Sequence, residues 1–208
     1  GELDLISYGY DGTRLVRKPD AVVRASSESE VAALLALAER HGIPVVPRGA
    51  ATNLTGGAVP VNGGVVLDFT LMNRILQIDT ENLTAVVEPG VVVGDLQREA
   101  MNNKLFYPPD PASNEFSTIG GNIAEGAGGL RGLKYGVTRD YVLGLEAYTI
   151  GGHKLSTGVS TIKSVTGYDL TRLLVGSEGT LAVITRATLK LIPLPVAIGT
   201  ARLIFPDG

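Results

Sequence analysis

Runs of apolar residues divide the first 70 residues into alternating strand and helix segments. AVVR at 21–24 is typical of a strand, and so are IPVV at 43–46 and VVLDF at 65–69. Between the first two lies SSESEVAALLALAERHG, in which apolar residues recur at helical spacing. The pattern predicts a strand–helix–strand unit whose helix packs on a sheet, forming a first lobe.

The helix in this unit carries its own start and stop signals. Ser27 is the expected N-cap, Glu30 completes a capping box and Gly42 ends the helix. Its apolar face is predicted to consist of Val31, Leu34, Leu35 and Ala38.

The remainder of the chain predicts a second, mixed α+β lobe. GDLQREAMNN, beginning near Gly94, is expected to be a short helix. Residues 107–136 show little periodicity, and long irregular segments inside compact domains are usually functional. Strands are predicted at 75–79, 83–89, 141–150, 180–192 and 197–205.

Composition narrows the class of protein. With 208 residues, 44% of them hydrophobic, the chain can bury a real core. Its formal charge of −3 disfavours a nucleic-acid partner. The sequence contains no cysteine and no apolar run long enough to span a membrane or act as a leader. We therefore expect no thiolate metal site and no transmembrane segment, and a cytoplasmic location fits best.

Glycines cluster at 49–64, 120–136 and 151–179. In the first cluster, which follows a predicted strand, converging backbone N–H groups could hold an anion such as a pyrophosphate. Arg48, Thr52, Asn53 and Thr55 would add side-chain donors. The alternative is that these glycines only form tight turns.

The later clusters raise the same question. In LLVGSEGTLAVIT (173–185), Glu178 lies inside a strongly apolar stretch, so we expect it to be buried with a partner. It is either a structural cap or ion-pair member, or a group that bonds a ligand. The sequence has neither a P-loop nor a Rossmann fingerprint. Its two histidines, His41 and His153, are expected to be structural, and no metal site is predicted.

Six segments in order carry a family resemblance: PRGAATNLTGG, YPPDPAS, TIGGNIAEGAGG, KYGVTRDYVLGLE, TGYDLTRLLVGSEGTLAVIT and LKLIPLP. The chain resembles, over about residues 5–195, FAD-linked oxidases of the vanillyl-alcohol-oxidase type, which have a PCMH-type FAD-binding domain. In particular it resembles the glycolate oxidase flavoprotein subunit and D-lactate dehydrogenase branch, more than the cell-wall precursor reductases that share the cofactor fold.

The resemblance implies an FAD-binding domain at 1–195 with two α+β lobes, about 1–74 and 75–195. The loop at 47–57 would take the pyrophosphate through its backbone, the segment from Pro109 to Ala124 would line the ribityl chain and flavin, and the segment at 178–184 would close the remaining side. The implied cofactor-binding residues are Pro47, Arg48, Gly49, Ala50, Ala51, Thr52, Asn53, Leu54, Gly56, Gly57, Pro109, Asp110, Pro111, Thr118, Gly120, Gly121, Asn122, Ala124, Glu178, Gly179 and Ile184.

Three positions depart from the family pattern. The family usually has glycine where Ala51 and Ala182 stand, and asparagine where Gly126 stands. The Cβ of Ala51 would either crowd the diphosphate or fix the loop in a conformation with φ below zero. Because Ala50 and Ala51 offer no attachment atom and cysteine is absent, FAD binding is expected to be non-covalent.

Family members continue into a substrate-binding (cap) domain, so residues 196–208 are expected to be its severed beginning and the rest of it to be absent. The resemblance implies oxidation of a 2-hydroxy acid by hydride transfer to flavin N5, with no catalytic residue assigned and with other oxidase subunits as candidate partners. Arg131 and Lys134 either steer the anionic substrate or are solvated surface charges. The alternative function is a non-catalytic nucleotide-binding subunit or scaffold completed by a partner chain, and the alternative location is the inner face of the membrane.

Overall fold

A three-stranded parallel sheet is formed by the first part of the chain. The computed structural model describes residues 2–158, 167–197, 199 and 201–205. After a short helix α1 (Glu2–Ile6), the strands β1 (Ala21–Arg24), β2 (Val45–Arg48) and β3 (Val65–Asp68) pair in the order β1-β3-β2. The predicted strand at 43–46 is thus found two residues later, because Gly42 and the following Ile43 still bond to the end of the preceding helix.

That helix, α2 (Glu28–His41), confirms the predicted N-cap and the predicted glycine at its end. Ser27 accepts from the backbone N–H of Glu30, and the Glu30 carboxylate accepts from the N–H of Ser26 rather than that of the N-cap itself. Gly42 ends the helix in the left-handed conformation, with φ of 62°. Its buried residues are Val31, Leu35 and Ala38, while Leu34 is half-buried.

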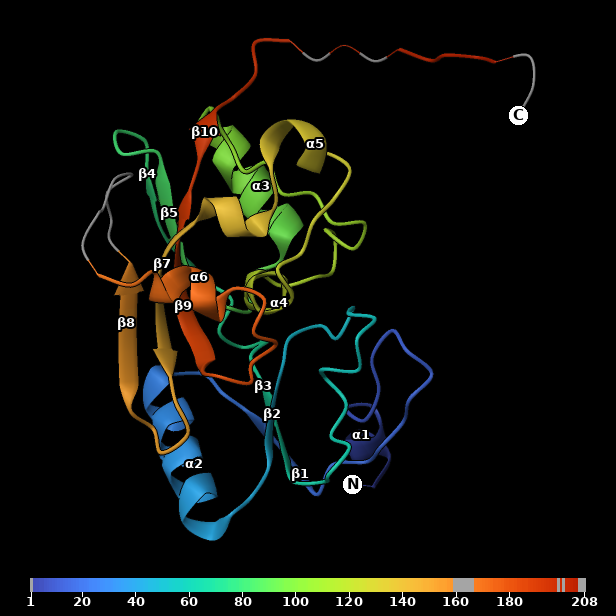
Figure 1. The fold of residues 1–208 in the computed structure, drawn as a ribbon, viewed down its shortest axis with the longest axis vertical. Coiled ribbons are helices and arrows are strands. Elements are labelled where there is room, and N and C mark those ends of the chain that lie inside the picture. The colour runs from blue at the N-terminus through green and yellow to red at the C-terminus, as the bar shows by residue number, and fades with distance from the viewer. Residues whose placement is uncertain (1, 159–166, 198, 200, 206–208) are drawn as a thin grey trace.

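A five-stranded antiparallel sheet forms the second layer, in the order β4-β5-β9-β7-β8. One face is covered by helices, as Figure 1 shows. Its strands are β4 (Ile75–Asp79), β5 (Thr84–Val87), β7 (Val142–Tyr148), β8 (Lys154–Gly158) and β9 (Val183–Lys190). The remaining elements are α3 (Val93–Asn102), β6 (Leu105–Phe106), α4 (Ile119–Glu125), α5 (Gly132–Tyr135), the 3₁₀ helix η1 (Thr138–Tyr141), α6 (Leu170–Leu174) and β10 (Ile192–Pro193).

Two hydrophobic clusters hold the layers together. The larger one joins the inner face of the five-stranded sheet to α3, α4 and α6, through residues such as Leu96, Ile123 and Leu189. The smaller one joins α2 and β3 to Tyr148 and Val183 of the other sheet. The two sheets therefore share a core, and α2 lies alongside the ends of β7 and β8 in Figure 1.

Several sequence predictions are wrong. Residues 107–136 were expected to be irregular but contain α4 and α5; α4 was hidden because its apolar face needs only Ile119 and Ile123 among glycines. The predicted strand at 197–205 is absent from the described residues of that range, which have no strand partner and extend away from the fold in Figure 1. The segments α1 and α6 were not predicted because five residues are too few to show a helical period. The strand β8 was not predicted because its sequence, KLSTG, contains one apolar residue.

Candidate functional site

A cavity of about 310 Å³ lies between the loop that follows β2, the first turns of α4 and the turn that precedes β9. Three segments far apart in the sequence therefore meet at one place. All the residues predicted to bind the cofactor line this cavity, except Gly56, Pro109 and Asp110.

Most of the loop at 49–57 lines this cavity, through residues 49–54 and Gly57. Within the described part of the chain, the N–H groups of residues 49–55 donate no hydrogen bond to any other residue. Seven consecutive unpaired amides would be costly if they had no ligand or solvent to bond. The backbone is shaped for this role by Ala51, which has a φ of 52°. The expectation of a negative φ at Ala51 is wrong: the residue takes the left-handed conformation that its glycine counterpart would adopt.

The side chains of the same loop are already used inside the protein, contrary to prediction. Arg48 donates to backbone carbonyls, the shortest bond being 2.6 Å to Tyr10 O. Asn53 Nδ2 donates to Asp11 Oδ2 at 2.7 Å, and Thr55 Oγ1 donates to Glu125 Oε1 at 3.0 Å. These three side chains hold the loop in place. Among the described residues, the predicted donors left for an anion are the backbone amides and the Thr52 hydroxyl, which lines the cavity and makes no hydrogen bond.

The first turn of α4 forms the opposite wall. Thr118 caps the helix by accepting from Gly121 N–H at 3.3 Å, and Gly120 N–H donates to Pro89 O at 2.8 Å. Gly49 lies so close to this turn that a Cβ placed on it would be 2.2 Å from Thr118 Oγ1. The wall also carries two buried polar atoms, Ser117 Oγ and Asn122 Nδ2, with no hydrogen-bond partner among the described residues.

A comparison with protein families matches residues 19–158 to the FAD binding domain family. The chain belongs to this family. FAD is therefore its cofactor, and the resemblance and the α+β fold class drawn from the six motifs are confirmed.

Two curated relatives and one solved structure show how similar this chain is to known proteins and how much of each it covers. The glycolate oxidase subunit GlcD of Bacillus subtilis is 54% identical over 189 residues, which are 90% of this chain and 40% of that protein. The D-lactate dehydrogenase of Anaerostipes hadrus is 45% identical over 181 residues, 87% of this chain and 38% of that protein. A solved structure of alkyldihydroxyacetonephosphate synthase has a TM-score of 0.82 at 28% identity, covering 94% of this chain and 40% of that one. The FAD-binding domain described here thus spans about 40% of the length of these proteins.

The cavity of this FAD-binding domain fits its cofactor chemically. Unpaired amides suit the two phosphates, because charge-assisted hydrogen bonds to an anion need donors and tolerate no carboxylate between them. The unpaired Ser117 Oγ and Asn122 Nδ2 are 3% and 5% exposed, and a buried polar group without a partner indicates a ligand. Apolar wall residues such as Phe69 and Val183 suit the ring systems.

Two carboxylates stand at one end of the cavity. Burial raises the pKa of Glu125, and the neighbouring charges of Glu178 and Asp11 raise it further, while the bond from Thr55 lowers it. The prediction that Glu178 is buried is wrong: it is exposed and has a φ of 52° in the turn before β9. The turn is attached to α4 by the backbone instead, because Glu178 N–H donates to Ala124 O at 2.9 Å.

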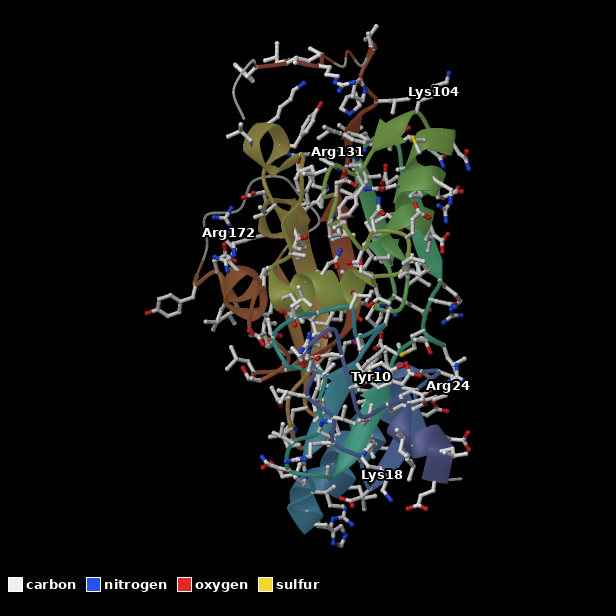
Figure 2. The ribbon with its side chains drawn as sticks, turned by 90° about the vertical axis from the view of Figure 1, so that its right-hand side faces the viewer. Tyr10, Lys18, Arg24, Lys104, Arg131 and Arg172 are labelled. Carbon is white, nitrogen blue, oxygen red and sulfur yellow. The ribbon has the colours of Figure 1, made fainter. Side chains whose placement is uncertain are left out.

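The remaining predicted residues lie outside the cavity. Gly56 faces Leu15, and Asp110 bonds Asn114 and pairs with Arg131 at 3.4 Å. The Arg131 guanidinium also lies 5.1 Å from the centre of the Phe106 ring, so its charge is already partnered. Figure 2 shows Arg131 at the end of the molecule that carries Lys104, opposite the end that carries Lys18. Lys134 lies over the Tyr135 ring.

The structure adds lining residues beyond those predicted to bind the cofactor. Pro89 and Phe69 come from segments that the sequence indicated only as strand ends, and no local signal could have placed them at a cavity. Glu125 lies within the motif TIGGNIAEGAGG and Ser117 directly before it, so both could have been found from the motif. The added lining residues are Ala58, Phe69, Pro89, Ser113, Ser117, Glu125, Ala127, Ala182 and Val183.

The described residues contain neither a candidate metal site nor a membrane-spanning helix. They contain no group of three or more histidine, aspartate or glutamate side chains placed to hold a metal ion. Their helices are all too short or too polar to cross a bilayer.

Proposed function

We propose that this chain is the FAD-binding domain of a flavoprotein that oxidises a 2-hydroxy acid of the glycolate or D-lactate type. Two related proteins that carry those names share 54% and 45% of their aligned residues with it. In this proposal residues 1–195 form the domain, with lobes at about 1–74 and 75–195, and residues 196–208 begin a substrate domain. A cytoplasmic location and association with other oxidase subunits belong to the same proposal.

One observation carries the cofactor part of the proposal: residues 49–54, whose N–H groups donate no hydrogen bond within the described part of the chain, line a cavity that has apolar walls. These amides would bind the diphosphate, and Ser117 Oγ and Asn122 Nδ2 would bond polar atoms of the bound group. Pro47, Pro89 and Ile184 would exclude water from it. No histidine lines the cavity and the chain has no cysteine, which supports non-covalent binding.

The protein's part in the reaction is to bind and orient. FAD would supply a hydride acceptor, flavin N5, for the hydrogen on the α-carbon of the hydroxy acid. The rigid contact between the loop at 49–57 and α4, through Gly49 and Thr118, would fix where that acceptor stands. We assign no catalytic base.

A visible absorption spectrum tests this proposal. The purified protein is mixed with excess FAD, passed through a desalting column and scanned; flavin absorbance that elutes with the protein is the expected result. Gly42→Ala, which alters a helix end remote from the cavity, is the control and should retain the same amount of flavin. A colourless protein that instead retains ADP would support the alternative, a non-catalytic nucleotide-binding subunit.

A further inference from the structure

We propose that the N-terminal hairpin, residues 8–17, is a working part of the FAD site, and that Asp11 is the residue that positions the phosphate-binding loop at 49–57. The inference rests on the proposed FAD site and extends it to a segment that precedes the family match, which begins at residue 19. The hairpin is defined by a bridge between Tyr10 and Val16 and by Arg17 N–H donating to Gly9 O at 2.8 Å.

Asp11 connects the hairpin to the loop by a pair of carboxylate oxygens. Oδ1 accepts from Thr13 N–H at 2.9 Å and from Thr13 Oγ1 at 2.6 Å, which fixes the carboxylate within the hairpin. Oδ2 accepts from Asn53 Nδ2 at 2.7 Å, which fixes the loop to it. Burial raises the pKa of Asp11, but hydrogen bonds from Thr13, Asn53 and the Gly56 amide outweigh it and hold the pKa below its usual range. Asp11 therefore remains an anion, with Oδ1 bound within the hairpin and Oδ2 bound to the loop.

The hydrogen bonds continue from Asp11 across the loop to α4. Asn53 Nδ2 also lies 3.2 Å from Thr55 Oγ1, and Thr55 Oγ1 in turn donates to Glu125 Oε1. Thr55 Oγ1 accepts from Gly57 N–H as well, at 3.3 Å. One chain of side chains thus joins the hairpin, the loop and the end of α4 without using any amide of residues 49–55.

The backbones of the hairpin and the loop are in direct contact. Gly12 N–H donates to Asn53 O at 2.9 Å. A Cβ placed on Gly12 would be 2.7 Å from Asn53 O and 2.7 Å from Leu54 Cδ2, so only glycine allows this approach. The contact uses the carbonyl of Asn53 and none of the N–H groups of residues 49–55.

Arg48 fastens the base of the loop to the same hairpin. Its Nη1 donates to Tyr10 O at 2.6 Å, and its guanidinium lies 5.6 Å and 5.8 Å from the ring centres of Tyr8 and Tyr10. Arg48 is 8% exposed, so its guanidinium binds the hairpin rather than a phosphate. Figure 2 shows Tyr10 where the N-terminal segment crosses in front of the parallel sheet, well above Lys18.

These contacts explain how a loop with unpaired amides keeps one shape. A binding loop that is ordered before the ligand arrives avoids the entropy cost of ordering on binding. The loop has no regular secondary structure of its own, so its order must come from neighbours. The hairpin supplies these neighbours, and Asp11 holds Asn53 of the loop through a side-chain bond of 2.7 Å.

FAD affinity at matched stability tests the proposal. Asp11→Asn removes one of the two acceptor oxygens and should weaken FAD binding roughly 10- to 100-fold, since a small misplacement of binding groups is costly. The affinity for ADP, which also carries a diphosphate, should fall in parallel. Asp20→Asn is the matched control: Asp20 accepts from Gly64 N–H at 2.6 Å, outside the cavity lining. Its FAD affinity should stay within about twofold of the parent.

The outcomes separate failure of the positioning role of Asp11 from failure of the proposed FAD binding. If the parent binds FAD and Asp11→Asn binds it as tightly as Asp20→Asn does, with similar melting temperatures, the positioning role is overturned. If the parent itself binds no FAD, the proposed function fails before the hairpin is tested. Should Asp11→Asn not fold, Gly12→Ala replaces it, because this variant pushes the hairpin away from the loop without removing a charge. Unchanged FAD and ADP affinity in a folded Gly12→Ala would then overturn the proposal.

Discussion

The contact between Gly49 and Thr118 predicts a specific pair of effects. In Gly49→Ala the new Cβ would be 2.2 Å from Thr118 Oγ1 and 3.3 Å from both Thr118 Cβ and Cγ2. The first distance is impossible, so either the loop or Thr118 must move. If Thr118 rotates, α4 loses the hydrogen bond that its side chain accepts from Gly121 N–H. Since Gly49 has no positive φ, the effect is steric rather than conformational.

The magnitude follows from these two contributions. Overpacking a tight contact costs about 1–3 kcal/mol, and losing an N-cap costs about 1 kcal/mol, so the free energy of unfolding should fall by about 2–4 kcal/mol. Thr118→Ala alone loses the cap and a buried methyl group, about 1–2 kcal/mol. If the two changes were independent, the double variant would lose about 3–6 kcal/mol.

Structure predicts a different result for the double variant. Thr118→Ala removes the Oγ1 and Cγ2 atoms, so the Cβ of Ala at 49 has only a 3.3 Å contact to relieve. The double variant should therefore be about as stable as Thr118→Ala alone, with a favourable coupling of about 2–4 kcal/mol. Urea unfolding of the four proteins without FAD measures this coupling. Gly42→Ala, which has open space around it and a φ of 62°, should lose only about 1 kcal/mol. Additive losses at 49 and 118 would refute the reasoning.

Three further predictions concern charge and backbone at the same site. Glu125→Gln should have a higher melting temperature than the parent at pH 7–8 and the same melting temperature near about pH 4. The reason is that burial raises the pKa of Glu125, so that ionising this group destabilises the folded protein as pH rises. An equal difference in melting temperature at both pH values would contradict this. Arg48→Met should lower the free energy of unfolding, measured in urea, by roughly 2–4 kcal/mol, since Tyr10 O loses a charged donor. A loss below about 1 kcal/mol would show that the guanidinium is dispensable. Ala51→Gly should change the free energy of unfolding by no more than about 0.5 kcal/mol, because relief of left-handed strain offsets the added entropy of the unfolded chain. Ala51→Val should lower the free energy of unfolding by about 1–3 kcal/mol. Equal unfolding midpoints for the two variants would contradict the φ of 52° at Ala51.

Local signals predicted the elements that depend on local interactions. The bounds of α2 could be read from Ser27, Glu30 and Gly42, because capping bonds join residues within four positions of one another. By contrast α4 has a capping threonine but is mostly glycine and small residues, and it is helical because Ile119 and Ile123 are buried in the larger core. Tertiary burial of this kind overrides propensity and leaves no periodic signal.

The candidate site divides in the same way. The glycine content of residues 49–57 indicated free amides, because that property belongs to the backbone of one loop. The roles of Arg48, Asn53 and Thr55 were misread because their partners lie 38, 42 and 70 residues away in sequence. Glu178 was expected to be buried because its neighbours are apolar, but the positive φ at this residue turns it outward.

The core shared by the two sheets has a consequence for how the nascent chain folds. Tyr148 and Val183 complete the cluster that surrounds Leu35 and Met72, so the first sheet cannot close its core until the ribosome has made residue 183. At typical synthesis rates of about 5–20 residues per second, the apolar face of α2 stays incompletely covered for roughly 6–20 s after Met72 is made. During that interval the half-made protein presents the kind of surface that chaperones bind.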